Sequence, residues 1–479
     1  MLAHRKTACF RNAINFHKSS LSSSYGSFCT NAHPSLCLSN ESFFNNHSKF
    51  IRTTDCINRT FSSSNHKTLS IALREALDYG ENKLRNALTF KHVEHDPEGE
   101  ARMLLFHTLF PKEPVEHLSS RWLSLSLRKD RLTPHQLDTF KSLIARRCQY
   151  EPIEYITGRV NFFGRQFLVN KHVLIPRVDS EVMIEAIMKR MNQFLKFSSS
   201  SDDQRIQRDG LNIVELGVGS GCLILTLLLE LEKANIKVQS AIGLDKSSEA
   251  LKVAALNAQQ LLPPRLCKKL ILKEHDMLCD EFKPEEWKSQ MNDNDDDSKM
   301  CVTCNSTFAN TSKRKVGIIT EDERNHHYGS THVLISNPPY IPSQVIMEEL
   351  DQDVSLHEPH LALDGGPDGL DFYRFLLSEK AMHKYRLLSS SESSLMALEL
   401  GYDQAPILMK NVLSTTVLAN NDEDDDTTNL QISNHEMKQQ RFLLGTSKSG
   451  SNFEFVVELE KDLNQFDRVL ILKTTKRTP

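Results

Sequence analysis

The chain has 479 residues, enough for roughly three domains of average size. Its composition, 39% hydrophobic and 25% charged, is that of a soluble globular protein, and it offers no apolar run of about 18 residues that would predict a membrane span. A formal net charge of -4 disfavours the strongly basic surface that a dedicated DNA- or RNA-binding protein carries.

The first 64 residues differ in composition from the rest of the chain. Residues 1–40 contain four Lys or Arg, many serines and no Asp or Glu, which is typical of an organellar transit peptide. Residues 59–64 (RTFSSS) resemble the site at which mitochondrial presequences are cut. We therefore expect residues 1–64 to be a disordered targeting segment for the mitochondrial matrix. A plastid address and a tail without any address are the alternatives. The cysteines show no regular framework spacing, so no disulfide scaffold is expected.

Residues 65–150 are predicted to form a small helical domain. Apolar residues recur at three- and four-residue steps from Leu69 to Leu88. Two further helices are expected to begin at Asp96-Pro97 and Thr133-Pro134, because an Asp or Thr N-cap there precedes a proline in the first turn. The segment holds no cluster of catalytic residue types, so substrate recognition or simple packing is its expected role.

The pattern changes twice after this domain. Between residues 155 and 175 the apolar period becomes two around Gly158 and Gly164, which predicts a β-hairpin, so residues 151–175 are expected to link two domains. Strands and helices then alternate through residues 176–479, which indicates an α/β sheet with helices on both faces. The expected strands are 212–216, 240–244, 270–275, 332–336 and 395–400, with a closing antiparallel pair at 453–458 and 467–472.

Two polar stretches interrupt this alternation. Residues 289–330 and 414–451 are rich in Asp, Asn, Ser and Thr and are predicted to be disordered surface insertions. In the first, Cys301 and Cys304 lie near His326 and His327. A single C-x-x-C without a second cysteine pair is a weak zinc signal, so we interpret it as coincidence and expect no metal.

A glycine-rich loop follows the first of these strands. Gly217, Gly219 and Gly221 allow a tight turn and the close approach of a ligand, at the edge where an open α/β sheet binds nucleosides. The spacing differs from the G-x-G-x-x-G of dinucleotide-binding folds, so it gives no clear fit to a pyrophosphate. Glu215, just before the loop, would face the positively charged amino group of a methionine moiety.

Carboxylates end the next two strands. Asp245 follows the second strand and is placed to accept both ribose hydroxyls. Asp276 follows the third and is placed for the adenine edge. Either residue could instead cap the helix that comes after it.

The decisive motif is Ser336-Asn337-Pro338-Pro339-Tyr340, directly after an apolar strand. The two prolines hold the turn rigid, so that the Asn337 side chain and the Pro338 carbonyl offer two fixed acceptors toward the cofactor. A planar NH2 group bound to both would present its nitrogen to an electrophilic methyl, while Tyr340 stacks on its face. A sulfonium methyl donor needs no protein nucleophile or metal, so positioning is the expected contribution. An ordinary proline-rich turn is the alternative.

These motifs together resemble the release factor glutamine methyltransferases of the HemK/PrmC family. The resemblance covers nearly all of residues 68–479 apart from the insertions and includes these segments: 154–158, 163–164, 173–177, 215–221, 336–341, 358–363, 365–374, 461–463 and 467–468. It implies a Rossmann-like class I S-adenosylmethionine-dependent methyltransferase domain, preceded by the small helical domain. It also implies that the substrate is the glutamine in the Gly-Gly-Gln loop of a class I peptide chain release factor.

The resemblance assigns roles to single residues as well. It implies that Gly217, Gly219, Gly221, Asp245 and Asn337 bind the cofactor, and that Asn337, Pro338, Pro339 and Tyr340 hold the glutamine. We expect Asn337, Pro338 and Tyr340 to be the catalytic residues. Glu215, Asp276 and Met277 are added to the predicted cofactor site, and Phe163 to the predicted glutamine site. Two departures are Val178, where the family usually has a second proline, and Met277, where many members have an aromatic residue. We expect a monomer that contacts neither nucleic acid nor membrane directly.

Two other functions use the same features. An adenine amino-methyltransferase acting on DNA or RNA would share the Asn-Pro-Pro-Tyr chemistry, but such enzymes extrude the base and usually carry a basic recognition domain. A non-catalytic, ribosome-associated binding module could keep the scaffold, although the complete motif set argues against it.

Overall fold

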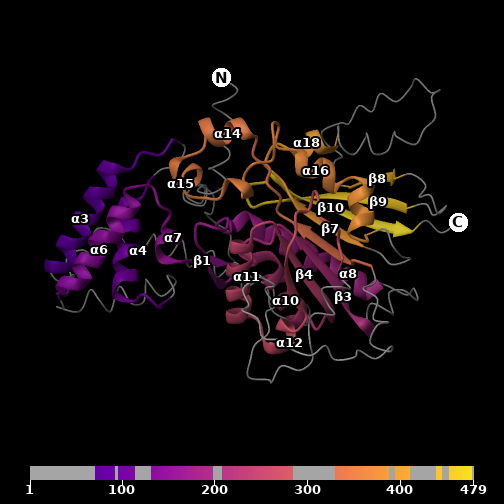
Figure 1. Ribbon diagram of the computed structural model, residues 1–479, viewed down its shortest axis with the longest axis horizontal. Coiled ribbons are helices and arrows are strands. Elements are labelled where there is room, and N and C mark those ends of the chain that lie inside the picture. The colour runs from indigo at the N-terminus through magenta and orange to yellow at the C-terminus, as the bar shows by residue number, and fades with distance from the viewer. Residues whose placement is uncertain are drawn as a thin grey trace, which may run out of the picture. The chain divides into compact units, whose positions relative to one another are not determined.

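A computed structural model describes residues 71–91, 95–113, 131–197, 208–283, 330–387, 394–409, 439–444 and 453–476 (Figure 1). The expected targeting segment, most of both expected insertions and the pair Cys301 and Cys304 lie outside these ranges. Within them, no helix is both long and apolar enough to cross a membrane. The chain divides into two compact units, one of residues 1–159, 164–166 and 351–357, the other of residues 160–163, 167–350 and 358–479.

The first unit is built from α3 (Ile71–Ala87), α4 (Pro97–Leu109), α6 (Pro134–Arg147), the short α7 (Ile153–Thr157) and α15 (Gln352–Ser355). Both predicted helix starts are confirmed: the Asp96 side chain accepts a hydrogen bond from Gly99 N, and Thr133 forms a capping box with Gln136. The apolar faces pack together as predicted, with Leu73, Leu77, Leu84, Ala101, Leu104, Leu105, Phe140, Leu143 and Ile144 buried.

The predicted hairpin is present but shorter than expected. Strands β1 (Arg159–Phe162) and β2 (Arg165–Leu168) form a two-stranded sheet. The residues before it, from Ile153 to Thr157, are helical, and α7 ends at Gly158, whose φ of 73° is the left-handed conformation that closes a helix. The alternation of apolar residues over 155–157 therefore predicted a strand where the structure has a helix.

The second unit contains a sheet of eight strands in the order β5-β4-β3-β6-β7-β10-β9-β8. The strands are β3 (Leu211–Leu216), β4 (Val238–Asp245), β5 (Leu270–Glu274), β6 (Val333–Ser336), β7 (Leu395–Glu399), β8 (Gln439–Leu444), β9 (Phe453–Lys461) and β10 (Asp467–Lys476). The first five are parallel, and β10 pairs antiparallel with both β7 and β9 (Figure 1). This is the Rossmann-like class I methyltransferase arrangement, and its strand order reverses between β3 and β6, where such sheets bind ligands.

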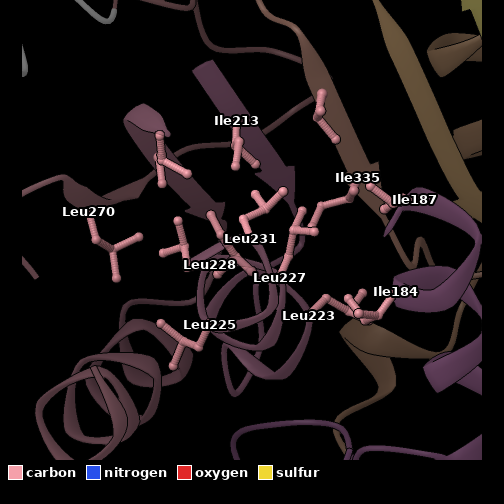
Figure 2. Packing of buried hydrophobic residues seen from close by; sticks show 14 of the residues in the cluster. Ile184, Ile187, Ile213, Leu223, Leu225, Leu227, Leu228, Leu231, Leu270 and Ile335 are labelled. Carbon is pink, nitrogen blue, oxygen red and sulfur yellow. The ribbon is translucent and has the colours of Figure 1, made fainter. Parts of the chain in front are cut away.

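Helices cover both faces of this sheet. Alternate residues of β3 point to opposite faces, so that Ile213 joins one core cluster and Val214 the other. The Ile213 face packs against α8 (Glu181–Phe197), α10 (Cys222–Lys233) and α11 (Ser248–Leu261), and Figure 2 shows Ile213 and Ile335 directed toward the leucines of α10. The opposite face is covered by α16 (Asp371–Leu376), α17 (Glu379–Lys384) and the region of α18 (Ala405–Ile407). The described part of this unit also contains the short helices α12 (Pro264–Cys267) and α14 (Ser343–Glu348) and the 3-10 helices η4 (Val178–Ser180) and η6 (His360–Ala362).

One prediction in this unit is wrong. Residues 439–444 were expected within a disordered insertion, whereas they form strand β8, which pairs antiparallel with β9 and brings Phe442 opposite Phe455. Residues 441–444 are apolar enough to add an edge strand. The stretch around them is rich in Asp, Asn and Ser, so the composition of the whole stretch predicts disorder.

Candidate functional site

The glycine-rich loop joins the carboxyl end of β3 to α10. Gly217 and Gly219 have φ values of 73° and 52°, a conformation that other residues rarely adopt. The backbone N–H groups of Gly217 and Val218 donate to Leu244 O at 2.8 and 3.0 Å, which anchors the loop to β4. A Cβ at Gly219 would meet no atom of the described residues within 4 Å, so one face of the loop is open to a ligand.

Asp245, the last residue of β4, holds this loop. Its carboxylate accepts Gly219 N–H and Ser247 N–H, each at 2.8 Å. The N-cap of α11 is Ser247, whose hydroxyl accepts from Ala250 N, so the alternative that Asp245 caps this helix is wrong. Burial raises the pKa of Asp245, while the bonds from Ser247 and Gly219 lower it. A carboxylate has about four lone-pair positions, and two therefore remain for ligand hydroxyls.

Two other acidic residues border the same cavity. Glu215 is buried, accepts Ile224 N–H at 3.0 Å, and has a pKa raised well above its usual range by burial. A cationic ligand group nearby would stabilise its charged form. Asp276 accepts Leu278 N–H at 3.0 Å and forms an ion pair with Lys246 at 2.9 Å, which lowers its pKa.

The Asn-Pro-Pro-Tyr turn begins at the end of β6, beside the glycine-rich loop. The Ser336 hydroxyl donates to Leu216 O at 2.7 Å, and these two residues are paired in the parallel register of β3 and β6. Asn337 is therefore adjacent to Gly217. A Cβ built on Gly217 would lie 3.9 Å from both Asn337 O and Met277 Cε. The loop, the turn and the residue after Asp276 thus meet at one point.

These elements enclose a cavity of about 230 Å³. Of the predicted residues, Glu215, Gly217, Gly219, Asp245, Asp276, Met277, Asn337 and Pro339 line it. Gly221, Pro338, Tyr340 and Phe163 are not among the described lining residues. Gly221 is the N-cap of α10, and Tyr340 packs on the core cluster that contains Val214. Phe163 packs on the Ile213 cluster, and its N–H donates to Glu181 Oε1 at 2.6 Å.

The sequence motifs did not predict one wall of the cavity. It consists of Lys171, His172, Val173, Leu174, Pro176, Arg177, Ser180, Pro359, Leu361 and Ala362. Glu358 joins its two segments, because its buried carboxylate forms an ion pair with Arg177 and accepts Ile175 N–H at 3.1 Å. Both segments belong to the family resemblance, but nothing in a single sequence indicates that residues so far apart are paired.

A buried acid lies at the end of β7, the strand next to β6. Glu399 is 1% exposed and is hydrogen-bonded by the Ser180 side chain. Its buried Oε2 has no hydrogen-bond partner among the residues that the structure describes. Burial raises the pKa of Glu399 to about 7, against the opposing attraction of Arg468 and the bond from Ser180. Glu399 is therefore half protonated near neutral pH.

This pKa predicts how stability depends on pH. The pKa in the folded protein, about 7, exceeds the ordinary glutamate value of 4.5, so ionisation of Glu399 is expected to destabilise the fold progressively as pH rises from about 4.5 through about 7. Glu399→Gln keeps the neutral shape. We expect urea unfolding to show the variant about 3 kcal/mol more stable than the unmodified protein near pH 8, and about equally stable near pH 4.5. A variant less stable at the higher pH would show that the carboxylate is needed in its charged form.

Comparisons with known proteins show the family to which the chain belongs. A family model described as the PrmC N-terminal domain matches residues 75–158. A release factor glutamine methyltransferase from Caulobacter vibrioides is 32% identical over 274 residues, which cover 57% of this chain and 69% of that protein. The chain belongs to the release factor glutamine methyltransferase family. A second family member, from Thermodesulfovibrio yellowstonii, is 27% identical over 354 residues, covering 74% of this chain and 88% of that protein.

Longer proteins also match. A bifunctional methyltransferase from Rickettsia typhi is 30% identical over 315 residues, which are 64% of this chain and 47% of that protein. The chain thus spans about half the length of such bifunctional relatives.

S-adenosylmethionine is the cofactor of this fold and family, and the residues around the cavity fit it. The open face over Gly219 leaves room for the ligand beside the glycine-rich loop. Asp245 retains acceptor positions for hydroxyl groups, and the Glu215 carboxylate suits an ammonium group. Met277 offers an apolar side chain at the Asp276 end of the cavity.

Proposed function

We propose that the protein methylates the side-chain amide nitrogen of the glutamine in the Gly-Gly-Gln loop of a class I peptide chain release factor. The observation that carries this proposal is the position of Asn337. It lines the cofactor cavity, next to Gly217, at the start of a turn held rigid by two prolines. Bound S-adenosylmethionine would supply a methyl group that its sulfonium charge already activates.

The protein's own contribution is to bind and orient the amide. The Asn337 side-chain oxygen and the Pro338 carbonyl are acceptors for the two N–H groups of a planar amide. An amide nitrogen is a poor nucleophile because its lone pair is delocalised. Acceptors on both N–H groups return electron density to the nitrogen and stabilise the positive charge that develops during transfer. Holding the reacting atoms close together contributes roughly 7–11 kcal/mol to such reactions.

The same acceptors select glutamine over glutamate. A glutamate carboxylate has no N–H donor, so it would leave buried acceptors without partners, at a cost of about 1–3 kcal/mol for each. Tyr340 follows the two prolines and is proposed to contact the face of the amide.

Turnover on purified substrates tests this function. The assay would follow methyl transfer to whole release factor, to the same factor with the loop Gln replaced by Glu, and to DNA and RNA duplexes. We expect transfer to the unmodified factor alone. Methylation of adenine in either nucleic acid would instead support an adenine amino-methyltransferase, and cofactor binding without any transfer would support a binding module.

We also propose that residues 1–64 direct the protein to the mitochondrial matrix, on the strength of their basic, serine-rich and acid-free beginning. A fluorescent protein fused behind these residues should enter mitochondria. Import into plastids would instead support a plastid transit peptide. Fluorescence that stays in the cytosol would refute the targeting role of these residues.

A further inference from the structure

The glycine-rich segment Gly365–Gly369 belongs to the family resemblance but has no part in the site as described so far. It lies against the back of the Asn-Pro-Pro-Tyr turn. Ile341 N–H donates to Leu363 O and Gly365 N–H donates to Ile341 O, both at 2.9 Å. The two segments therefore form a short backbone pairing just after Tyr340.

The fit between these segments leaves no room for side chains. A Cβ at Gly365 would lie 2.8 Å from Pro339 O, and a Cβ at Gly369 would lie 2.3 Å from Tyr340 O. Gly369 also has a φ of 77°. The carbonyl groups of Pro339 and Tyr340 thus lie directly against glycine backbone. The direction of each of these two carbonyls therefore depends on the segment Gly365–Gly369.

Gln404 also holds the peptide that joins Tyr340 to Ile341. This side chain is 5% exposed, and its Nε2 donates to Tyr340 O at 2.9 Å and to Gly369 O at 3.1 Å. Its Oε1 accepts Gly401 N–H at 2.9 Å. Both amide hydrogens are used on carbonyls of the two packed segments, and the oxygen is held from the turn after β7. The Gln404 amide therefore joins the end of the Asn-Pro-Pro-Tyr turn to the glycine-rich segment.

We infer that Gln404 is a positioning residue that orients the Asn337–Tyr340 turn for the substrate amide, a role that rests on the proposed function. The reason is geometric. The Tyr340 carbonyl belongs to the peptide that joins Tyr340 to Ile341, and the fixed φ of Pro339 limits how far the Pro338 carbonyl can move independently of it. Without the Gln404 donors this peptide would be held, among the described residues, by the bond from Ile341 N–H to Leu363 O alone, and its orientation would loosen. Small displacements of a reacting group lower rates steeply, by up to about 10²-fold for 1 Å.

Gln404→Glu tests the inference, because it keeps the size of the side chain and the acceptor for Gly401 but replaces the NH2 group, with its two donors, by an oxygen that carries one hydrogen at most. Gln404→Met removes the donors without adding charge and serves if the first variant does not fold. Gln239→Glu, at an exposed position of β4, is the matched control. We expect kcat on release factor to fall about tenfold in both Gln404 variants, with little change in the affinity for S-adenosylmethionine.

Amide hydrogen exchange gives a readout that does not depend on activity. Hydrogen exchange of the Ile341 and Gly365 amides should become faster in the Gln404 variants. The amide of Gly217, in the glycine-rich loop, donates a hydrogen bond to Leu244 O and should keep its protection. Unchanged exchange at Ile341 and Gly365 would overturn the inference. Faster exchange at all three amides together with a lower Tm would also overturn it, because Gln404 would then be a general stabilising residue. If the unmodified protein does not methylate release factor, the proposed function fails, while the exchange result still decides whether Gln404 holds the turn.

Discussion

Asn337→Ala is expected to lower the turnover of release factor by about 10²- to 10³-fold, the loss typical of removing one positioned polar group from a reaction centre. The variant lacks one of the two acceptors that orient the substrate amide, so the nitrogen is presented poorly to the methyl group. Cofactor binding should change little, because Asp245 and the glycine-rich loop keep their hydrogen bonds. Single-turnover kinetics at saturating S-adenosylmethionine measures the transfer step directly.

The matched control is Gln259→Ala, which removes an amide side chain at an exposed position of α11. It should leave turnover unchanged. Comparing kcat with KM separates an effect of Asn337 on the transition state from an effect on substrate binding. A residue that acts mainly in the transition state lowers kcat more than it raises KM. Near-normal turnover in Asn337→Ala would refute the assignment of this residue and with it the proposed mechanism of amide binding.

Local signals in the sequence predicted the parts of the structure that depend on neighbouring residues. The starts of α4 and α6 follow from an N-cap residue and a proline placed next to each other. The glycine-rich loop and the Asn-Pro-Pro-Tyr turn each follow a short apolar strand, and parallel strands bring their carboxyl ends to one edge of the sheet. The cofactor site could therefore be predicted from motifs and their order.

Contacts between distant segments could not be predicted in this way. Glu358 pairs with Arg177, and Gln404 with the Tyr340 carbonyl, across separations that no local pattern encodes. Such pairs depend on where each loop leaves the sheet and on which side chains then fill the space. The contacts of Phe163 were equally beyond local patterns: it packs on the core, and its N–H donates to Glu181. Its role as a substrate residue stays a prediction.

Asp245→Ala is expected to weaken the affinity for S-adenosylmethionine by about 100-fold. The carboxylate holds Gly219 and Ser247 and is proposed to accept the ribose hydroxyls. Hydrogen bonds to a charged group contribute about 1.5–3 kcal/mol each, and every 1.4 kcal/mol is about tenfold in affinity. Isothermal titration calorimetry gives the affinity directly, and kcat at saturating cofactor should fall much less than the affinity does.

Asp245→Asn separates the two roles of this carboxylate. The amide keeps one oxygen that can accept either Gly219 N–H or Ser247 N–H, but its NH2 group cannot accept the other bond or a ribose hydroxyl. We therefore expect an affinity between those of the alanine variant and the unmodified protein, about tenfold below the latter. Asp209→Ala, at a half-buried residue paired with Arg208, should bind the cofactor normally. Unchanged affinity in Asp245→Ala would remove Asp245 from the ribose role. Reduced affinity with the same value in both Asp245 variants would mean that the negative charge, rather than the number of acceptors, determines binding.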